Sequence, residues 1–239
     1  YLKAAEALAG FIQKQMYTKK SGLFRTWRNS QPGKSALLED YAAVILGLLS
    51  LYQVSPRPEI YAFAEELRAE MEARFRHPEQ GYFDSQADPT LLFRGRDAQD
   101  NATPSGNALA AQTLLVFYSI TGRPEERDAA FEMLAAAAPL IRRYPTSFAA
   151  WLSAAALASK PPETLVIALP ESLEMPPESL STVLSTYQPF RSIVQFSPGS
   201  PTKPPGIAHG KVCVDDKITY YNCRNFTCDL PVTNPEELA

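Results

Sequence analysis

The sequence predicts a mainly helical protein, in which about three helical hairpins of a ring are followed by a small α/β domain. Two observations predict this fold class. Amphipathic segments alternate with almost wholly apolar ones along residues 1–160, with a loose period of about 60 residues. Near residue 160 the composition then changes to short strand-like segments separated by proline-rich loops.

The first hairpin is expected to pair residues 2–16 with residues 36–52. Within 2–16, apolar residues recur at steps of three and four, and polar residues occupy the other face. This spacing is typical of an amphipathic helix with one buried face. The second segment, ALLEDYAAVILGLLSLY, is apolar nearly all round after its two acids. Such a segment is typical of a helix that is buried on most sides.

The same pairing of segments returns twice along the chain. Amphipathic segments again precede apolar ones, at 60–75 and 104–120 and then at 125–144 and 147–159. Pro139 is expected to bend or end the helix that contains it. This alternation predicts a ring of helical hairpins, in which the outer helices are buried on one side and the inner helices on all sides. Since the common ring has six hairpins, we expect a partial (α/α)6 toroid over residues 1–160.

Residues 163–239 are expected to form the small α/β domain. Two short apolar runs, 165–169 and 191–197, are candidates for buried strands on either side of a helix at 176–188. Residues 211–223, KVCVDDKITYYNC, predict a β-hairpin with residues 215–217 near its turn.

Charge and hydropathy exclude two kinds of partner. The net charge of −3 comes from 23 basic and 26 acidic residues that are scattered along the chain. No basic stripe therefore offers a surface for nucleic acid. No apolar run approaches the length of a spanning helix and no signal peptide is recognisable, so we expect no membrane partner and a cytoplasmic location. The start at Tyr1 leads us to expect a piece of a longer chain.

The cysteines and the absence of several sequence motifs limit which disulfides, metal sites and enzyme classes can be expected. Three cysteines, an odd number, argue against a disulfide framework and for a reducing compartment. A zinc site at His209, Cys213, Cys223 and Cys228 is the alternative, but the spacing of these residues is not that of a standard zinc knuckle. No glycine-rich phosphate loop, serine-hydrolase elbow or zincin motif is present. We expect neither a metal nor a cofactor.

Four motifs in one order carry a resemblance that covers essentially the whole chain. They are LLEDYAAVILGLLSLY, GYFDS, RDAQDNATPSGNALAA and YYNCRNFTCDLPVTNPEEL. In this order they resemble the C-terminal part of the thioredoxin-domain family that includes spermatogenesis-associated protein 20. The resemblance implies a toroid similar to those of N-acylglucosamine 2-epimerases and six-hairpin glycosidases. It also implies an N-terminal thioredoxin-like domain with a Cys-x-x-Cys motif, which these 239 residues do not contain.

The most unusual stretch is RDAQDNATPSGNALAAQ, residues 96–112. Thr103 and Pro104 make a good helix start, and the acids upstream suit the positive end of a helix dipole. Capping thus explains much of this stretch. It does not explain Asn107, whose amide lies in the first turn of an otherwise apolar helix and needs a cavity or a buried partner. Burying an unpaired amide costs roughly 1–3 kcal/mol.

The residues that capping leaves unexplained predict a polyol pocket where inner helices begin. Asp100 is the expected catalytic carboxylate there, with Asn101, Ser105 and Asn107 as substrate-binding residues. Asp40, at the start of the preceding inner helix, is the second expected catalytic group, with Tyr41 beside it. Because adjacent helical residues point about 100° apart, Glu39 and Asp40 cannot both face one centre. Capping and pairing with the helix dipole remain the alternative for these acids.

Two loops add further candidates. GLFRTWRN and GYFDSQ place aromatic rings beside charged groups, an arrangement that favours sugar rings. Arg25 and Trp27 are the expected substrate-binding residues of these loops. Phe24 and Phe83 are interpreted as plugs between hairpins.

Taken together, these residues predict a carbohydrate-binding or carbohydrate-modifying enzyme that uses carboxylate acid/base chemistry. The alternative is a non-catalytic module that binds a ligand or a partner together with the thioredoxin-like domain. A purely structural scaffold is the third possibility. The expected partners are a small polyol or sugar, that thioredoxin-like domain, and a second copy of the chain, since an open half-ring leaves apolar flanks exposed.

Overall fold

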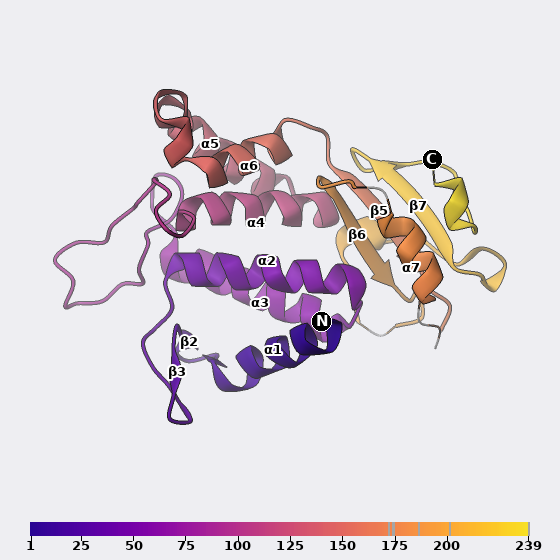
Figure 1. Ribbon diagram of the computed structural model, residues 1–239, viewed down its shortest axis with the longest axis horizontal. Coiled ribbons are helices and arrows are strands. Elements are labelled where there is room, and N and C mark those ends of the chain that lie inside the picture. Colours follow the sequence, from indigo (N-terminus) through magenta and orange to yellow (C-terminus); the bar gives the residue numbers. More distant parts are fainter. Residues whose placement is uncertain (172, 174, 186, 201, 239) are drawn as a thin grey trace.

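The computed structural model describes residues 1–171, 173, 175–185, 187–200 and 202–238. A layer of helices occupies residues 2–158, and a β-sheet crosses one end of that layer (Figure 1). The helices of the layer are α1 (Leu2–Gln15), α2 (Leu38–Val54), α3 (Pro58–Phe75), α4 (Gly106–Thr121), α5 (Pro124–Arg143) and α6 (Ala149–Ala158). Two small hairpins follow α1, namely β1 (Tyr17–Thr18) with β2 (Gly22–Leu23) and β3 (Trp27–Arg28) with β4 (Gln31–Pro32).

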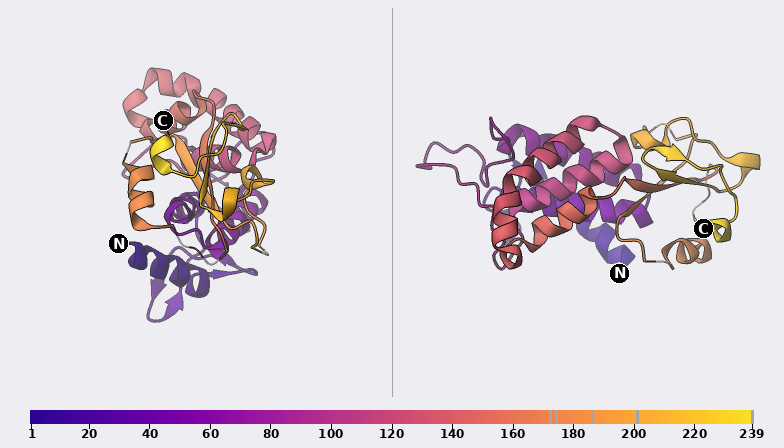
Figure 2. Two further views of the ribbon diagram at one scale, coloured as in Figure 1. Left: turned by 90° about the vertical axis from the view of Figure 1, so that its right-hand side faces the viewer. Right: turned by 90° about the horizontal axis from the view of Figure 1, so that it is seen from above.

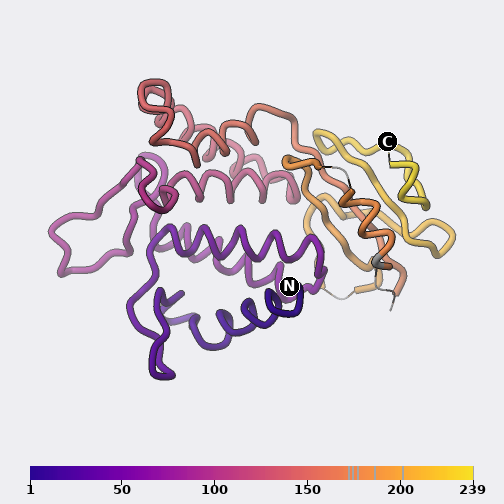
Figure 3. Tube along the Cα trace, viewed as in Figure 1, coloured from indigo at the N-terminus to yellow at the C-terminus, as the bar shows by residue number. Residues whose placement is uncertain are grey.

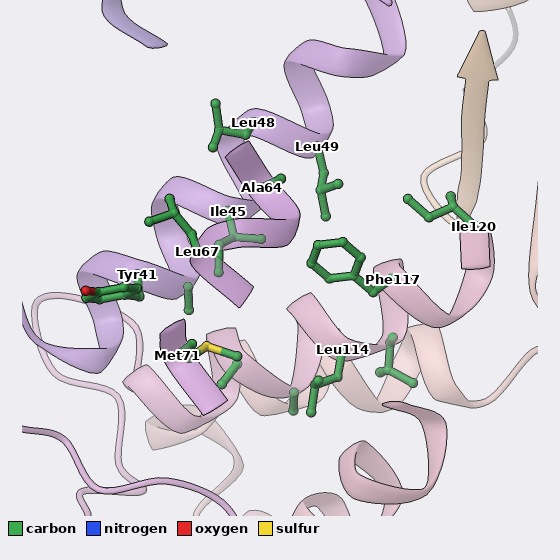
Figure 4. Packing of buried hydrophobic residues seen from close by; sticks show 14 of the residues in the cluster. Tyr41, Ile45, Leu48, Leu49, Ala64, Leu67, Met71, Leu114, Phe117 and Ile120 are labelled. Carbon is green, nitrogen blue, oxygen red and sulfur yellow. The ribbon is translucent and has the colours of Figure 1, made fainter. Parts of the chain in front are cut away.

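Helices α2 and α4 form the centre of the layer. They run side by side toward the sheet (Figure 1), and α3 and α5 pack against their outer sides. Ile45 and Leu49 of α2 meet Leu67 of α3 and Phe117 of α4 in one continuous core (Figure 4). The mainly helical character predicted from the sequence is confirmed. The assignment of these helices to a toroid stays a prediction.

Local sequence signals explain where several helices begin and end. Proline occupies the first position of α3 (Pro58) and of α5 (Pro124), where its missing N–H costs nothing. Helix α4 ends at Gly122, whose φ of 75° lies in the left-handed region that glycine adopts freely.

The expected start of α4 is wrong, and Pro139 does not end the helix that contains it. Helix α4 starts at Gly106 and not at Thr103–Pro104, because the Ser105 side chain is the group that accepts from the Ala108 N–H. Helix α5 continues through Pro139 to Arg143. Pro139 is exposed, and so is residue 135, whose carbonyl loses its partner to the proline ring; water can therefore bind that carbonyl.

The sheet has the strand order β6-β5-β7-β8. Its strands are β5 (Glu163–Ala168), β6 (Arg191–Phe196), β7 (Thr219–Arg224) and β8 (Thr227–Cys228). Strands β5 and β6 are parallel and are joined by α7 (Pro177–Leu184), whereas β7 runs antiparallel to β5. Figure 2 shows α7 on the face of the sheet that points away from the helical layer.

The end of α2 attaches the sheet to the helices. Tyr52 Oη donates to the Gln195 carbonyl at 3.0 Å, and the Ile193 N–H donates to Gln53 Oε1 at 3.2 Å. These bonds cover the open edge of β6, which would otherwise present unpaired backbone groups. Val166 and Val194 belong to the same hydrophobic cluster as α2 and α4. The division at residues 160–163 into two domains stays a prediction.

The predicted hairpin over residues 211–223 is wrong. Residues 214–216 form a short 3-10 turn, and β7 pairs with β5 on one side and with β8 on the other. The chain reverses instead at Asn225 and Phe226, which both have positive φ. Alternation of apolar residues identified β7 as a strand, but its neighbour is β5, a strand that ends at Ala168, long before β7 begins at Thr219.

The expectation against a disulfide is also wrong. Cys223 and Cys228 lie opposite each other in the β7–β8 register and form a disulfide, while Cys213 is free and half-buried. The odd number of cysteines carried no information about this local pairing. The disulfide uses two of the four ligands of the zinc set that the sequence offered as an alternative.

Across the described part of the chain, no helix combines the length and apolar character that a bilayer crossing requires.

Candidate functional site

The starts of α2 and α4 lie side by side at the end of the layer that is remote from the sheet (Figure 1). Gly106 makes this approach possible. A β-carbon added to Gly106 would lie 3.0 Å from the Glu39 backbone nitrogen and 3.3 Å from the Leu38 side chain. The positive ends of two helix dipoles therefore meet at one place.

A small polar hollow of about 180 Å³ opens between these two helix starts. We call it the helix-start hollow. It is lined by Leu37, Glu39, Asp84, Asp97, Gln99, Asn101, Thr103, Pro104, Ser105 and Gly106. Three of these residues carry a carboxylate and two an amide, and the two helix N-termini favour negative charge at this point.

Asp84 connects the start of α2 to the loop that contains Asp97. Its carbonyl accepts from the Leu38 N–H at 3.0 Å, and its Oδ2 accepts from the Asp97 N–H at 2.7 Å. Burial raises the pKa of the Asp84 carboxyl above its ordinary value, and the charges of Asp97 and Glu39 raise it further, although the Asp97 N–H lowers it. Asp84 therefore keeps a proton to a higher pH than a free aspartate does.

Asp40, an expected catalytic residue, acts first as a helix cap. Its Oδ2 accepts from the Leu37 N–H at 2.8 Å and from Arg25 Nη1 at 3.1 Å. Burial raises the Asp40 pKa, while Leu37 and Arg25 oppose that shift. Arg25 Nη1 also lies 2.8 Å from Glu39 Oε1, so this guanidinium bridges the two acids. As the spacing of helical residues required, only Glu39 of the pair lines the hollow.

Asp100, the other expected catalytic residue, joins two helix starts. Its Oδ1 accepts from the Ser105 N–H and its Oδ2 from the Ala150 N–H, both at 2.8 Å. Asp100 thus caps α6 and orders the turn before α4, and it is not among the residues that line the helix-start hollow. An acid/base function for Asp40 and Asp100 stays a prediction.

The substrate-binding residues expected from the sequence separate into two groups. Asn101 and Ser105 line the hollow. Arg25 does not line it but forms an ion pair with Glu39, which does. Tyr41 is buried in the core, where its hydroxyl accepts from the Leu23 N–H at 2.8 Å. Trp27 packs its ring edge-on against Phe11 at 5.5 Å.

Asn107 is the clearest case of a polar residue with a structural partner. Its Oδ1 accepts from the Tyr82 N–H and its Nδ2 donates to the Tyr82 carbonyl, both at 2.9 Å. The amide therefore pairs with the Tyr82 backbone as a neighbouring strand would. It also borders a second hollow of about 310 Å³, with Arg96 and Trp151 on its walls.

The residues that the sequence reasoning did not assign to the site are Glu39, Asp84 and Asp97. Asp84 follows the aromatic residues of the GYFDSQ loop, Glu39 is the neighbour of Asp40 at the start of α2, and Asp97 suits the positive end of a helix dipole, so none of them stood out as the main site residue. One signal in the sequence could have found them. GYFDS and the stretch 96–112 both precede the start of an inner helix, so their acids could be expected to lie near each other.

No family model matches the chain. The chain is similar to spermatogenesis-associated protein 20 of Mus musculus, with 29% identity over 98% of the chain, and to the Homo sapiens protein of that name, with 28% identity over 98% of the chain. It is also 26% identical to an uncharacterised protein of Caenorhabditis elegans over 85% of the chain. The chain spans about a third of the length of these relatives, at 32%, 30% and 28%. These similarities support the resemblance drawn from the motifs, and the names of the relatives state no activity.

Proposed function

We propose that this chain is part of a carbohydrate-binding or carbohydrate-modifying protein and that the helix-start hollow takes a polyol. The observation that supports the proposal is the convergence of three carboxylates and the Asn101 amide in one polar hollow. Carboxylates accept hydrogen bonds from sugar hydroxyls, and an amide both donates and accepts. The hollow is therefore chemically matched to a ligand with several adjacent hydroxyl groups.

The same groups offer a route to acid/base chemistry. Asp84, with its raised pKa, is the natural general acid of the set. Glu39 and Asp97 border the same hollow and are the candidates for the complementary base or the nucleophile. Arg25 Nη1 lies 2.8 Å from Glu39 Oε1, and this ion pair holds the Glu39 carboxylate at the edge of the hollow.

Thermal unfolding in the presence of monosaccharides, disaccharides and alditols tests the proposal. We expect at least one polyol to raise the Tm, because a ligand at 100 times its Kd stabilises the folded state by about 2.7 kcal/mol. Asp84→Asn should abolish that rise. Asp88→Asn, an exposed residue of the neighbouring loop, is the matched control and should preserve it. Asp100→Asn tests the assignment made from the sequence.

Two results would contradict this reading of the site. The first is the absence of any Tm rise across the panel. The second is a polyol-induced rise that Asp84→Asn leaves unchanged, since the ligand would then bind elsewhere. Loss of the rise in Asp100→Asn alone would place the carboxylate that binds the polyol at Asp100 instead of Asp84.

A partner-binding module is the second candidate function, and a projecting loop favours it. Residues 86–96 extend beyond the helices, as the loop at the left of Figure 3 shows. Leu92 is fully exposed and Phe93 is 80% exposed on this loop. Apolar side chains of α1 and α6, such as Leu8 and Leu152, are also exposed. Uncovered apolar surface of this kind usually binds a partner.

Light scattering distinguishes the partners that we propose. We expect the chain alone to form dimers or larger species, and Leu92→Asp to shift the population toward monomer. Leu230→Asp, which replaces an exposed leucine far from the loop, should change nothing. A monodisperse monomer would contradict self-association. If adding a thioredoxin-like domain from a full-length relative then also gave no complex, the partner-binding function would be excluded.

A further inference from the structure

A second site lies at the opposite end of the molecule, where the parallel strands β5 and β6 end. Because these strands are parallel, the loops that follow them leave the same edge of the sheet and diverge from there. Such an edge is where open α/β sheets usually bind ligands. A cleft of about 740 Å³ opens here, closed on its other side by the start of α1 and the α2–α3 connection. Figure 1 shows the N-terminal end of α1 beside this edge.

Most of the surface that lines this cleft is apolar. Tyr52 and Tyr61 lie in the floor with their ring centroids 5.4 Å apart. Both hydroxyls are already engaged, since Tyr52 donates to the Gln195 carbonyl and Tyr61 to Glu65, so the rings are what remains for a ligand. Besides four prolines, the other apolar lining residues are Leu2, Val54, Leu169, Leu173, Met175, Leu180 and Phe196. A cleft of this size and lining is typical of sites for small apolar ligands.

Among the described charged residues that line the cleft, Lys203 is the cation without a paired acid. Glu6 accepts from Ser55 Oγ at 2.6 Å, and Arg57 pairs with Glu59 at 2.7 Å. Within the described residues, Lys203 makes no ion pair. In the described part of the rim, the Lys203 ammonium therefore lies next to the apolar interior without a paired acid, while the Glu6 carboxylate adds a negative charge on the α1 side of the cleft.

The cleft wall also contains a buried acceptor without a partner. Gln195 is 1% exposed and its Nε2 donates to the Gln53 carbonyl at 2.6 Å, which determines the orientation of the amide. No donor of the described residues reaches Gln195 Oε1, nor does Ser197 Oγ have a partner there. Polar atoms inside a protein are normally hydrogen-bonded. These two groups are therefore free to form hydrogen bonds with a ligand beside the cleft.

We propose that this cleft binds an anionic amphiphile, with its apolar chain over Tyr52 and Tyr61 and its carboxylate at Lys203. Neither the loop after β5 nor the loop after β6 has the glycine-rich pattern that cradles phosphates. The mostly apolar lining favours a ligand with an apolar chain over a sugar. This site is independent of the helix-start hollow, so either can fail without the other.

Calorimetric titration with a series of straight-chain carboxylates, from octanoate to hexadecanoate below their micelle concentrations, tests the proposal on the full chain. We expect one site per chain and an affinity that rises about fourfold for each added methylene until the cleft is filled. Primary alcohols of the same length should bind more weakly. Lys203→Gln should reduce the affinity for the carboxylate to that for the alcohol, and Lys217→Gln, an exposed lysine outside the cleft, should not.

A second pair of variants locates the bound chain. Leu173 is 46% exposed at the cleft mouth, so Leu173→Glu leaves the core intact and should weaken carboxylate binding by more than tenfold. Leu230→Glu and Leu92→Glu place the same charge on exposed leucines elsewhere and should have no effect. The proposal is overturned if no carboxylate binds, if Leu173→Glu binds like the wild type, or if Leu92→Glu abolishes binding, since the ligand would then lie on the projecting loop.

Discussion

Replacing Asn107 by alanine is expected to lower the free energy of unfolding by about 2–5 kcal/mol. The Asn107 amide satisfies both the N–H and the carbonyl of Tyr82, at a place where Tyr82 is fully buried. Alanine would leave a buried donor and a buried acceptor unpaired, and each such group costs about 1–3 kcal/mol. Urea unfolding of the two proteins, followed by circular dichroism, measures the difference.

The same change should also impair the helix-start hollow. Tyr82 is two residues before Asp84, so loss of the backbone pairing releases the loop that positions the Asp84 carboxylate. Asn101→Ala is the matched control for stability, because Asn101 is exposed and should cost less than about 0.5 kcal/mol. A loss below about 1 kcal/mol for Asn107→Ala would show that the amide is not the main support of this loop.

Stability is expected to fall between about pH 4.5 and pH 7 because of one buried acid, Glu126. Its side chain is 2% exposed, and burial raises its pKa from 4.5 to about 7 despite the opposing charges of Arg123 and Arg68. A folded pKa above the unfolded one means that the folded state holds the proton more tightly. The resulting stabilisation is complete below pH 4.5 and is lost as the pH rises through 7. Its size is on the order of 3 kcal/mol.

Glu126→Gln should remove this part of the pH dependence, because glutamine does not ionise and still accepts a hydrogen bond from Thr121 Oγ1. Urea unfolding at pH 5 and at pH 8 measures the change. The difference between the two pH values should shrink in Glu126→Gln and stay at the wild-type size in Glu125→Gln, which alters an exposed neighbour in the same helical turn. Equal pH dependence in wild type and Glu126→Gln would refute a raised pKa at this position.

Much of the helical layer was predictable from the sequence because its causes are local. The periodic spacing of apolar residues located α1 to α6 to within a few residues, and proline and glycine signals explain several of their ends. Strands β5 and β6 were found for the same reason, as short apolar runs bounded by turn residues. Pro139 misled the prediction because its effect depends on exposure, which periodicity does not reveal.

The candidate site was only partly predictable, since its residues are chosen by contacts between distant segments. The sequence located the region: Asn101 and Ser105 line the helix-start hollow as expected. It did not distinguish carboxylates that cap a helix, such as Asp40 and Asp100, from carboxylates that face the hollow, such as Glu39 and Asp84. Both kinds occur in the same short motifs, and the difference is the direction of a side chain.

The amino-acid sequence by itself determined the mainly helical character, the order of the helices and the polar stretch that precedes α4. These follow from hydrophobic periodicity and backbone preferences, which act over a few residues. Only the tertiary structure decided that α2 and α4 begin at one place, that Asn107 pairs with the Tyr82 backbone and that Cys223 lies opposite Cys228. Each of these depends on packing and register between segments, and no local pattern of residues encodes that geometry.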